Sequence, residues 1–388
     1  MKIAVWPTLE PRRRPAATLM GAHPRTGLPV TISMDRTLRL KVIDACGMTC
    51  TFCHNEGTPV LADNLGRAPA EMTAAGRSGR VSIYLGSNGA GFLPATVAPD
   101  ESLADTLALL RDALCVDELH LTGGEPTLHP KLAEVVGVGA AAGYKVCATS
   151  NGENGVRVLP ACGEAGLERV NFSIFGTTAA ELAQVQHGKF ANTIRAERKI
   201  RALQDSIQVA VAHGIRANAN IVVPNEDHVP RVHRLLSEYS PAISVRLLNS
   251  LDEGEESIEA IYGLLRDLKV VPVGIHVTAG ASGWRTAYRL PTGRVVYFKQ
   301  IRPVRLPETC TGCRFNNSTD CEEGYYGVRL YRDRDGVFQV GVCIQRMDLC
   351  LPVEEFVRSD LRAEILALRE AEYRKLARKY GVEGEVRN

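Results

Sequence analysis

Short apolar runs and stretches with helical spacing alternate from about residue 37 to residue 250. The apolar runs predict strands, and apolar positions three and four residues apart predict helices. The expected strands are Arg39–Ile43, Glu118–Thr122, Lys145–Ser150, Arg169–Ile174, Arg216–Val223 and Ile243–Leu248. The expected helices include Ser102–Leu114, Pro130–Ala142, Asn192–Asp205 and Val229–Tyr239. Apolar strands separated by helices imply an α/β fold with a parallel sheet and right-handed crossovers.

The segments outside this region follow other patterns. Residues 1–36 are rich in Pro and Gly and predict an irregular N-terminal extension. Within the alternating part, which we place at 37–255, the Gly- and Ala-rich insertion 58–100 is longer than the usual link between two strands. Such insertions are often lids and more rarely surface loops, so we expect a partial cover of a site. The remaining part, 256–388, ends in apolar residues at helical spacing over 353–380, which predict an amphipathic helix docked on the body.

Composition narrows the class of protein. A chain of 388 residues with 45% hydrophobic content can bury a sizeable core, and a formal charge of +2 gives no reason to expect nucleic acid. Pro7 and Pro11 interrupt any signal-like pattern, and no apolar run approaches the roughly 18 residues of a membrane span. We therefore expect a cytoplasmic protein without a membrane partner, whose 11 cysteines are metal ligands rather than disulfides.

Three of these cysteines, Cys46, Cys50 and Cys53, follow the first predicted strand with the spacing C-x3-C-x2-C. Three thiolates on one short loop can hold three corners of a [4Fe–4S] cluster and leave the fourth iron open. A structural zinc site needs four ligands, and a disulfide framework needs even pairing in an oxidising compartment. An iron–sulfur cluster is the interpretation that uses all three cysteines.

A second motif, Gly123-Gly124-Glu125-Pro126, follows the second predicted strand. Glycines allow backbone carbonyls to approach a ligand closely, and a carboxylate pairs with an ammonium group. Taken alone, this sequence is equally well explained as a simple turn.

Together the two motifs resemble the radical S-adenosylmethionine (SAM) superfamily. The resemblance implies a partial (β/α)6 barrel whose ligands lie at the carboxyl ends of the strands. It also implies that the reduced cluster cleaves SAM to methionine and a 5′-deoxyadenosyl radical, which abstracts hydrogen from a substrate. A flavodoxin- or ferredoxin-type protein would supply the electron.

The resemblance assigns roles to further residues near the motifs. Gly124 and Glu125 would hold the amino group of SAM, Ser173 its carboxylate or ribose, and Phe52 and Leu251 would flank adenine. The expected SAM-binding residues are Phe52, Gly123, Gly124, Glu125, Asn151, Ser173 and Leu251. His54 and His120 lie next to this site and are the candidate catalytic residues.

The C-terminal part carries a second group of cysteines. A hairpin around Asp335-Gly336 is expected to return Cys343 to the pair Cys310 and Cys313. The pattern resembles the short auxiliary-cluster domain called a twitch domain, and a fuller SPASM domain fits less well because its later C-x3-C pair is missing. Local spacing alone leaves structural zinc open. The position behind a radical SAM core favours a second [4Fe–4S] cluster on Cys310, Cys313, Cys321 and Cys343, with Cys350 as a substitute ligand or a free thiol. Cys115, Cys147 and Cys162 are expected to be packing residues.

Over about residues 37–250 and 310–345 the chain also resembles the GTP 3′,8-cyclases of molybdenum cofactor biosynthesis. The matching segments are Thr149–Gly152, Val170–Ser173, Asn218–Val223 and Arg246–Asn249. Two nucleotide-binding cations of that family are replaced here, by His120 and Asn218. Their loss should weaken binding of a polyanion, which implies a different substrate.

These expectations lead to one function and three alternatives. The first is a radical SAM enzyme that cyclises, epimerises, dehydrates or couples a nucleoside- or sugar-like precursor, as in antibiotic pathways. The alternatives are a true GTP 3′,8-cyclase, a peptide-modifying radical SAM enzyme, and a non-catalytic scaffold with zinc at both cysteine sets.

Overall fold

Six parallel strands form the centre of the protein in the computed structural model, which describes residues 18–24, 26–59, 67–68, 71, 82–88, 94–317 and 319–381. The strands are β3 (Thr37–Ile43), β4 (Glu118–Gly123), β5 (Lys145–Ser150), β6 (Leu167–Ser173), β7 (Arg216–Val223) and β8 (Ser244–Asn249). They are neighbours in this order, and each pairs in parallel with the next. The predicted strands are therefore confirmed, to within two residues at each end.

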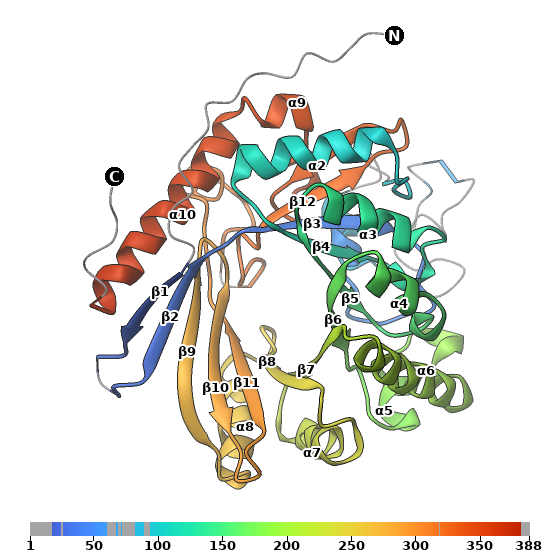
Figure 1. Cartoon of the computed structure of the whole chain (residues 1–388), viewed down its shortest axis with the longest axis vertical. Helices are drawn as coiled ribbons and strands as arrows, with labels where there is room; N and C mark the ends of the chain where they lie inside the picture. The colour runs from blue at the N-terminus through green and yellow to red at the C-terminus, as the bar shows by residue number, and fades with distance from the viewer. Residues whose placement is uncertain are drawn as a thin grey trace.

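Helices cover the outer side of this curved sheet, and Figure 1 shows α3, α4 and α6 outside the arc of strands. The helices along this part of the chain are α1 (Leu85–Asn88), α2 (Glu101–Leu114), α3 (Leu132–Ala141), α4 (Gly155–Glu164), α5 (Ala179–Gln184), α6 (Thr193–Ala212), α7 (Val229–Glu238) and α8 (Gly254–Asp267). Strand, helix and parallel strand in succession make the fold a partial (β/α)6 barrel, as the sequence predicted.

The pleat of each strand divides core from cavity. In β4, Leu119 and Leu121 are fully buried and pack in the core cluster, whereas Glu118, His120 and Thr122 line a cavity. Because successive side chains point to opposite faces, the same strand supplies both the helix-facing core and the polar interior.

The expectation of an irregular extension over residues 1–36 was wrong for its described part. β1 (Thr18–Ala22) and β2 (Pro29–Met34) are antiparallel strands, and β2 pairs in parallel with β9 (Val271–Ala279). Within the described part, Pro24 and Gly27 fall in the turn between the strands, whereas Val30 and Ile32 in β2 are fully buried and alternate with more exposed neighbours. The period-2 pattern determined the structure here, and the composition did not.

The sheet also extends beyond β8 by strands that the sequence analysis did not identify. β9, β10 (Gly283–Arg289) and β11 (Val295–Ile301) form an antiparallel unit, and β11 pairs in parallel with β8. Figure 1 shows this unit facing β5–β7 across the inside of the arc.

On the opposite edge, the predicted hairpin around Asp335-Gly336 is confirmed. It consists of β12 (Val328–Arg332) and β13 (Phe338–Gly341), with β12 pairing in parallel with β3 and β13 pairing with β14 (Leu351–Pro352). The C-terminal helical segment is also confirmed, as α9 (Val353–Phe356) and α10 (Asp360–Lys379).

Helix α10 is fixed to the body by a buried charge. It packs against β2 and β9, and its Arg369, 1% exposed, donates to Asp35 at 3.3 Å and to the Leu114 carbonyl.

Most of the expected cover, 58–100, lies outside the described residues. No helix in the described part of the chain has the length and apolar character to cross a bilayer.

Candidate active site

A cavity of about 820 Å³ opens inside the arc, between β3–β8 on one side and β9–β11 on the other. Its lining contains all three cysteines of the first motif and the Gly123–Glu125 turn. It also contains the predicted residues Phe52, His54, His120, Asn151 and Ser173. Leu251 follows β8 and lies outside this lining. The fold therefore joins residues that are far apart in the sequence into one site.

Side chains from three other segments hold the backbone of the cysteine loop. Glu153 accepts the Gly47 N–H at 2.8 Å, Gln186 accepts the Thr49 N–H at 2.8 Å, and Arg195 donates to the Gly47 carbonyl at 3.1 Å. A Cβ on Gly47 would overlap the Glu153 carboxylate. The loop is thus shaped by its surroundings before any ligand binds.

The sulfur atoms of this loop accept N–H groups. The Met48 backbone and the Asn151 amide donate to Cys46 Sγ at 3.4 and 3.6 Å, and the Gln186 amide donates to Cys50 Sγ at 3.6 Å. Hydrogen bonds of this kind stabilise thiolate and orient it toward a metal. The donors at Cys46 and Cys50 therefore fit thiolate ligands of an iron–sulfur cluster.

A buried polar network around Lys41 joins the two ends of the cysteine loop. Lys41, 2% exposed, donates to Asp44 Oδ1 and to the Asn55 carbonyl, both at 3.2 Å, and it also contacts the Thr58 hydroxyl. Asn55 and Glu56 have φ values of 48° and 53°, a left-handed conformation that non-glycine residues seldom adopt. The network keeps the chain in this tight return beside the cavity.

Glu56 connects the loop to the C-terminal hairpin. Its carboxylate accepts from Arg329 Nε at 2.8 Å, and the Tyr331 hydroxyl donates to its carbonyl at 3.1 Å. Burial opposes ionisation of Glu56, but the guanidinium of Arg329 outweighs it and lowers the carboxyl pKa to about 2. Sequence analysis did not foresee this pair, because its partners are 273 residues apart.

The two glycines of the second motif allow it to lie against the cysteine loop. A Cβ on Gly123 would strike the Ile43 carbonyl, and one on Gly124 would strike the carbonyls of Asp44 and Ala45. The Gly124 N–H donates to Ile43 and the Glu125 N–H to Ala45, both at 2.8 Å. The sequence motif was explained above by close approach to a ligand, and the structure adds close approach to the neighbouring loop.

Glu125 is held in one orientation at the cavity wall. It is 1% exposed and accepts from the backbone and hydroxyl of Thr127, from the Ser150 hydroxyl at 2.6 Å and from the Asn151 N–H at 2.6 Å. Burial raises its pKa, against the effect of these hydrogen bonds. Phe52, 47% exposed, lies at the same wall with its ring 5.2 Å from that of Phe175.

Burial lowers the pKa of both candidate catalytic histidines. His54 Nδ1 accepts the Glu56 N–H at 3.0 Å, so this side chain also shapes the loop, and burial lowers its pKa. His120 Nε2 is 2.8 Å from Thr149 Oγ1, and burial together with Arg39 lowers the pKa of His120 well below its usual value. A neutral imidazole is suited to accepting a proton or hydrogen-bonding a substrate, and less suited to acting as a general acid.

Glu118, His120 and Cys147 bring ligand atoms within 4.8 Å of one another, a grouping that sequence analysis did not identify. Arg169 already donates to Glu118 at 2.8 Å and to the Cys147 sulfur at 3.2 Å. Burial raises the Cys147 pKa to about 12. A metal ion would have to displace a guanidinium and deprotonate this thiol, so the group does not suit a metal.

The four cysteines Cys310, Cys313, Cys321 and Cys343 line a second, smaller pocket. The Leu306 N–H donates to Cys310 Sγ at 3.3 Å, and Arg346 donates to Cys313 Sγ at 3.6 Å. Cys350 lies outside this lining, and burial raises the pKa of its thiol to about 12. The structure thus brings the four expected ligands together in one pocket, and Cys350 lies outside its lining.

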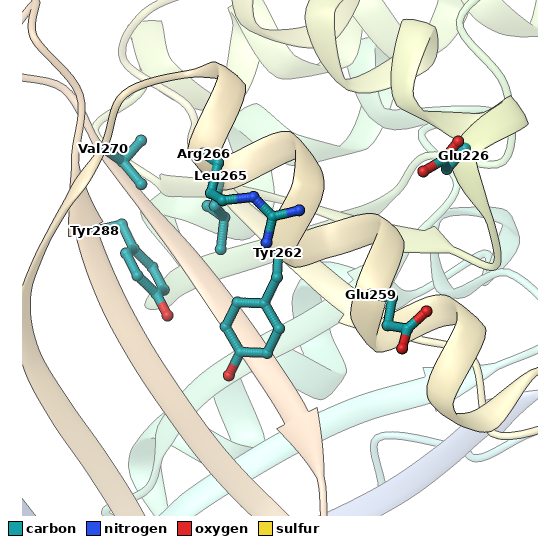
Figure 2. A pocket seen from close by; sticks show the side chains of 7 residues that line it. All are labelled: Glu226, Glu259, Tyr262, Leu265, Arg266, Val270 and Tyr288. Atoms are coloured by element: carbon teal, nitrogen blue, oxygen red, sulfur yellow. The ribbon is translucent and has the colours of Figure 1, made fainter.

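A third hollow, of about 580 Å³, is formed by α8 and its neighbours (Figure 2). Its lining residues are Glu226, Glu259, Tyr262, Leu265, Arg266, Val270 and Tyr288. It contains no cysteine and none of the predicted site residues. The two cysteine sets identified from the sequence lie in the barrel cavity and in the second pocket instead.

Comparison with known proteins gives matches along most of the chain. The Radical SAM superfamily matches residues 40–238, slightly more than half of the 388 residues. The probable GTP 3′,8-cyclase of Metallosphaera sedula is 24% identical over 345 residues, which cover 87% of this chain and 93% of that protein. The probable GTP 3′,8-cyclase of Aeropyrum pernix is 26% identical over 72% of this chain and 69% of its own length. Among solved structures, Streptococcus suis SuiB aligns with a TM-score of 0.38 and 13% identity over 64% of this chain and 50% of SuiB.

Proposed function

This chain belongs to the radical SAM superfamily, and we propose on that basis that it abstracts hydrogen from a small polar substrate bound in the barrel cavity. The protein is an enzyme of the radical SAM type that uses a [4Fe–4S] cluster and SAM. The observation that supports the site most strongly is that the three cysteines and the Gly123–Glu125 turn share one cavity with a polar inner wall.

We assign the cluster to Cys46, Cys50 and Cys53, and the methionine end of SAM to the Gly123–Glu125 turn. Bound together, the cluster and SAM supply a 5′-deoxyadenosyl radical for hydrogen abstraction. Glu125 is fixed by four hydrogen bonds, so a carboxylate is already in place for an ammonium group. Asn151, Ser173 and Phe52 line the space next to that turn and are assigned to the rest of SAM.

The inner wall supports a hydroxyl-rich substrate that is nucleoside- or sugar-like. Thr149, Asn171 and Asn220 line the cavity, and Asn171 Oδ1 is held by the Asn218 amide at 2.9 Å and by Arg246 at 3.0 Å. Oriented amides and hydroxyls give hydrogen-bonding specificity at low cost in entropy. Cyclisation, epimerisation, dehydration or carbon–carbon bond formation would follow from the position at which hydrogen is removed.

We further propose a second [4Fe–4S] cluster on Cys310, Cys313, Cys321 and Cys343, in a twitch-type domain. Four cysteines in one pocket leave no iron open, which favours electron transfer over substrate binding. Arg346 and the Leu306 N–H donate to sulfur atoms there, as expected beside thiolate ligands. A flavodoxin- or ferredoxin-type partner is proposed as the electron donor to the first cluster.

GTP 3′,8-cyclase activity is the second candidate, because the M. sedula relative with that name aligns over 93% of its length. The replacement of family cations by His120 and Asn218 speaks against it. A scaffold with zinc at both cysteine sets is the candidate from another class.

Anaerobic reconstitution with iron and sulfide separates these candidates. The proposal predicts about eight irons per chain and formation of 5′-deoxyadenosine that depends on dithionite and SAM. Zinc without iron, or iron without SAM cleavage, would contradict the proposal. Rapid turnover of GTP by the reconstituted enzyme would establish the second candidate instead.

A further inference from the structure

The wall formed by β9, β10 and β11 places basic side chains next to one another. Arg285 on β10 lies opposite His276 on β9 and opposite Lys299 on β11. All three residues line the barrel cavity. Residues directly opposite in an antiparallel pair project to the same face, and like charges in such positions are destabilising.

Arg246 adds another cation to this wall. It lies on β8, which is the parallel neighbour of β11, and it also lines the cavity. Burial, Arg285 and Arg169 lower the pKa of Arg246 to about 10, which still leaves it charged at neutral pH. Its Nε atom is buried and has no hydrogen-bond partner in the described part of the chain.

The carboxylates of the cavity are engaged elsewhere. Glu118 pairs with Arg169 and Asp117 with Arg36, each at 2.8 Å, and Glu56 pairs with Arg329. Across residues 18–381, wherever the structure describes them, no carboxylate forms an ion pair with Arg246, Arg285 or Lys299. Arg285 and Lys299 face the rings of Tyr297 and Tyr326, at 5.3 and 5.9 Å.

His276 does not add a further positive charge to this wall. Burial and Arg285 lower the pKa of His276 to about 4, so it is neutral at pH 7 and hydrogen-bonds Ser33 at 2.9 Å. Three positive groups therefore remain without a partner anion in a cavity that also contains the SAM-binding turn. Local repulsion of this kind is typical of a site shaped for a ligand rather than for stability.

We propose that Arg246, Arg285 and Lys299 bind a phosphate group of the substrate, which directs the rest of the molecule toward the SAM-binding end of the cavity. This inference rests on the proposed function, since it takes the cavity to be the substrate space. A phosphate dianion balances more of the three charges than a carboxylate does, and guanidinium groups bind phosphate through paired hydrogen bonds. The sequence-based expectation of a weakened anion site took no account of Arg285 and Lys299, whose strands the sequence analysis did not identify.

Equilibrium dialysis of the reconstituted, SAM-bound enzyme against inorganic phosphate tests the proposal. The variants Arg246→Gln and Arg285→Gln should each raise the dissociation constant for phosphate at least tenfold. Arg289→Gln, at the exposed end of the same strand, is the matched control and should bind phosphate as the unmodified enzyme does. Failure of the unmodified enzyme to bind phosphate, or equal losses in the control, would overturn the proposal. Tighter binding of acetate than of phosphate would also overturn it, in favour of a carboxylate substrate.

Two further measurements separate misfolding and loss of function from loss of the anion site. Without phosphate, Arg285→Gln should melt at the same or a higher temperature, because repulsion is removed. Phosphate should raise the melting temperature of the unmodified enzyme and of Arg289→Gln, and should raise that of Arg246→Gln and Arg285→Gln much less. Substrate-independent release of 5′-deoxyadenosine tests the SAM chemistry alone. Its absence would refute the proposed function, and its presence without phosphate binding would refute only this inference.

Discussion

Both cysteine sites combine local backbone bonds with side chains from distant parts of the chain, but the distant contacts fall at different points. At the second site Glu364 accepts the N–H groups of Glu308 and Thr309, which precede the first cysteine, whereas at the first site the distant side chains bind within the loop. The backbone of the first loop is bound by Glu153, Gln186 and Arg195, whose side chains come from distant parts of the barrel. The second site begins with a turn stabilised by local backbone bonds, from Cys310 to Leu306 at 3.0 Å and from Cys313 to Cys310 at 3.2 Å.

The spaces that the two cysteine sites face also differ. The first loop faces a cavity of about 820 Å³ with a mixed polar and apolar lining, whereas the second lies in a small pocket with an almost entirely apolar surface. A catalytic centre needs space for substrate and a geometry fixed from outside, whereas an electron-transfer site needs only enclosure. The contrast is consistent with one site that performs chemistry and one that exchanges electrons.

Removing one ligand from each site gives the largest expected effect. Cys50→Ala should abolish SAM cleavage, because two thiolates do not retain the open cluster. Cys343→Ala should lose about half of the iron yet continue to release 5′-deoxyadenosine. Iron analysis and product chromatography measure both outcomes, with Cys115→Ala as the control outside both sites. Loss of SAM cleavage in Cys343→Ala would contradict the proposal that the first site cleaves SAM without the second.

The ion pair between Glu56 and Arg329 links the first cysteine loop to strand β12, and the substitution Arg329→Met should break it. A buried carboxylate without its partner costs about 3–5 kcal/mol of the free energy of unfolding. Urea denaturation at pH 7 measures this loss. The exposed pair Glu197–Arg201 is the matched control, and Arg201→Met should cost less than about 0.5 kcal/mol. A loss below 1 kcal/mol in Arg329→Met would contradict a structural role for the pair.

The same pair predicts a pH dependence. The folded-state pKa of Glu56 is about 2, below its ordinary value of 4.5, so its contribution to stability is complete above about pH 4.5. That contribution, about 3 kcal/mol, is lost as the pH falls through about 2. The free energy of unfolding of Glu56→Gln should therefore fall less steeply over this range than that of the unmodified protein. Parallel curves for the two proteins would rule this out.

Substitution of the residues expected to flank adenine should have a smaller effect, on SAM affinity. Phe52→Ala should weaken SAM binding about tenfold, as expected when a stacking surface for a base is removed. Leu251→Ala should leave SAM affinity unchanged, because Leu251 lies outside the cavity lining. Isothermal titration with the reconstituted enzyme measures both. A loss in Leu251→Ala equal to that in Phe52→Ala would restore the sequence-based assignment of Leu251.

Removing the hydrogen bonds to the cysteine sulfur atoms should have the smallest effect, a change in reduction potential. It allows the two sites to be compared directly. Gln186→Leu removes the donor to Cys50 and should lower the reduction potential of the first cluster by several tens of millivolts. Arg346→Met removes the donor to Cys313 and should shift only the second cluster. Redox titration followed by electron paramagnetic resonance resolves the two signals. A shift of both signals in either variant would indicate that the clusters are coupled.

The sequence was sufficient where local pattern determines structure. Strand and helix periods predicted the parallel strands and their helices, and the resemblance carried by the two motifs predicted the partial barrel. The spacing of Cys46, Cys50 and Cys53 directed attention to the loop that lines the barrel cavity. The strands β9–β11 were missed although β9 and β11 contain apolar residues, because they follow one another without the helices that separate the other strands. The middle strand, β10, carries no apolar run. The contacts of Glu153 and Gln186 with the cysteine loop could not be predicted from the sequence. These residues lie 106 and 137 positions from their partners and approach the loop only in the folded chain.

The pairing of β12 with β3 has a consequence for how the enzyme is made. Strand β3 leads into the first cysteine loop, and its neighbour on that edge comes from residues 328–330. Glu56 and Gly57 likewise pack against residues beyond 328, including Ile344. During synthesis the loop emerges from the ribosome long before these partners. We therefore expect iron delivery to follow release of the nearly complete polypeptide, and nascent chains arrested before residue 328 to remain unloaded.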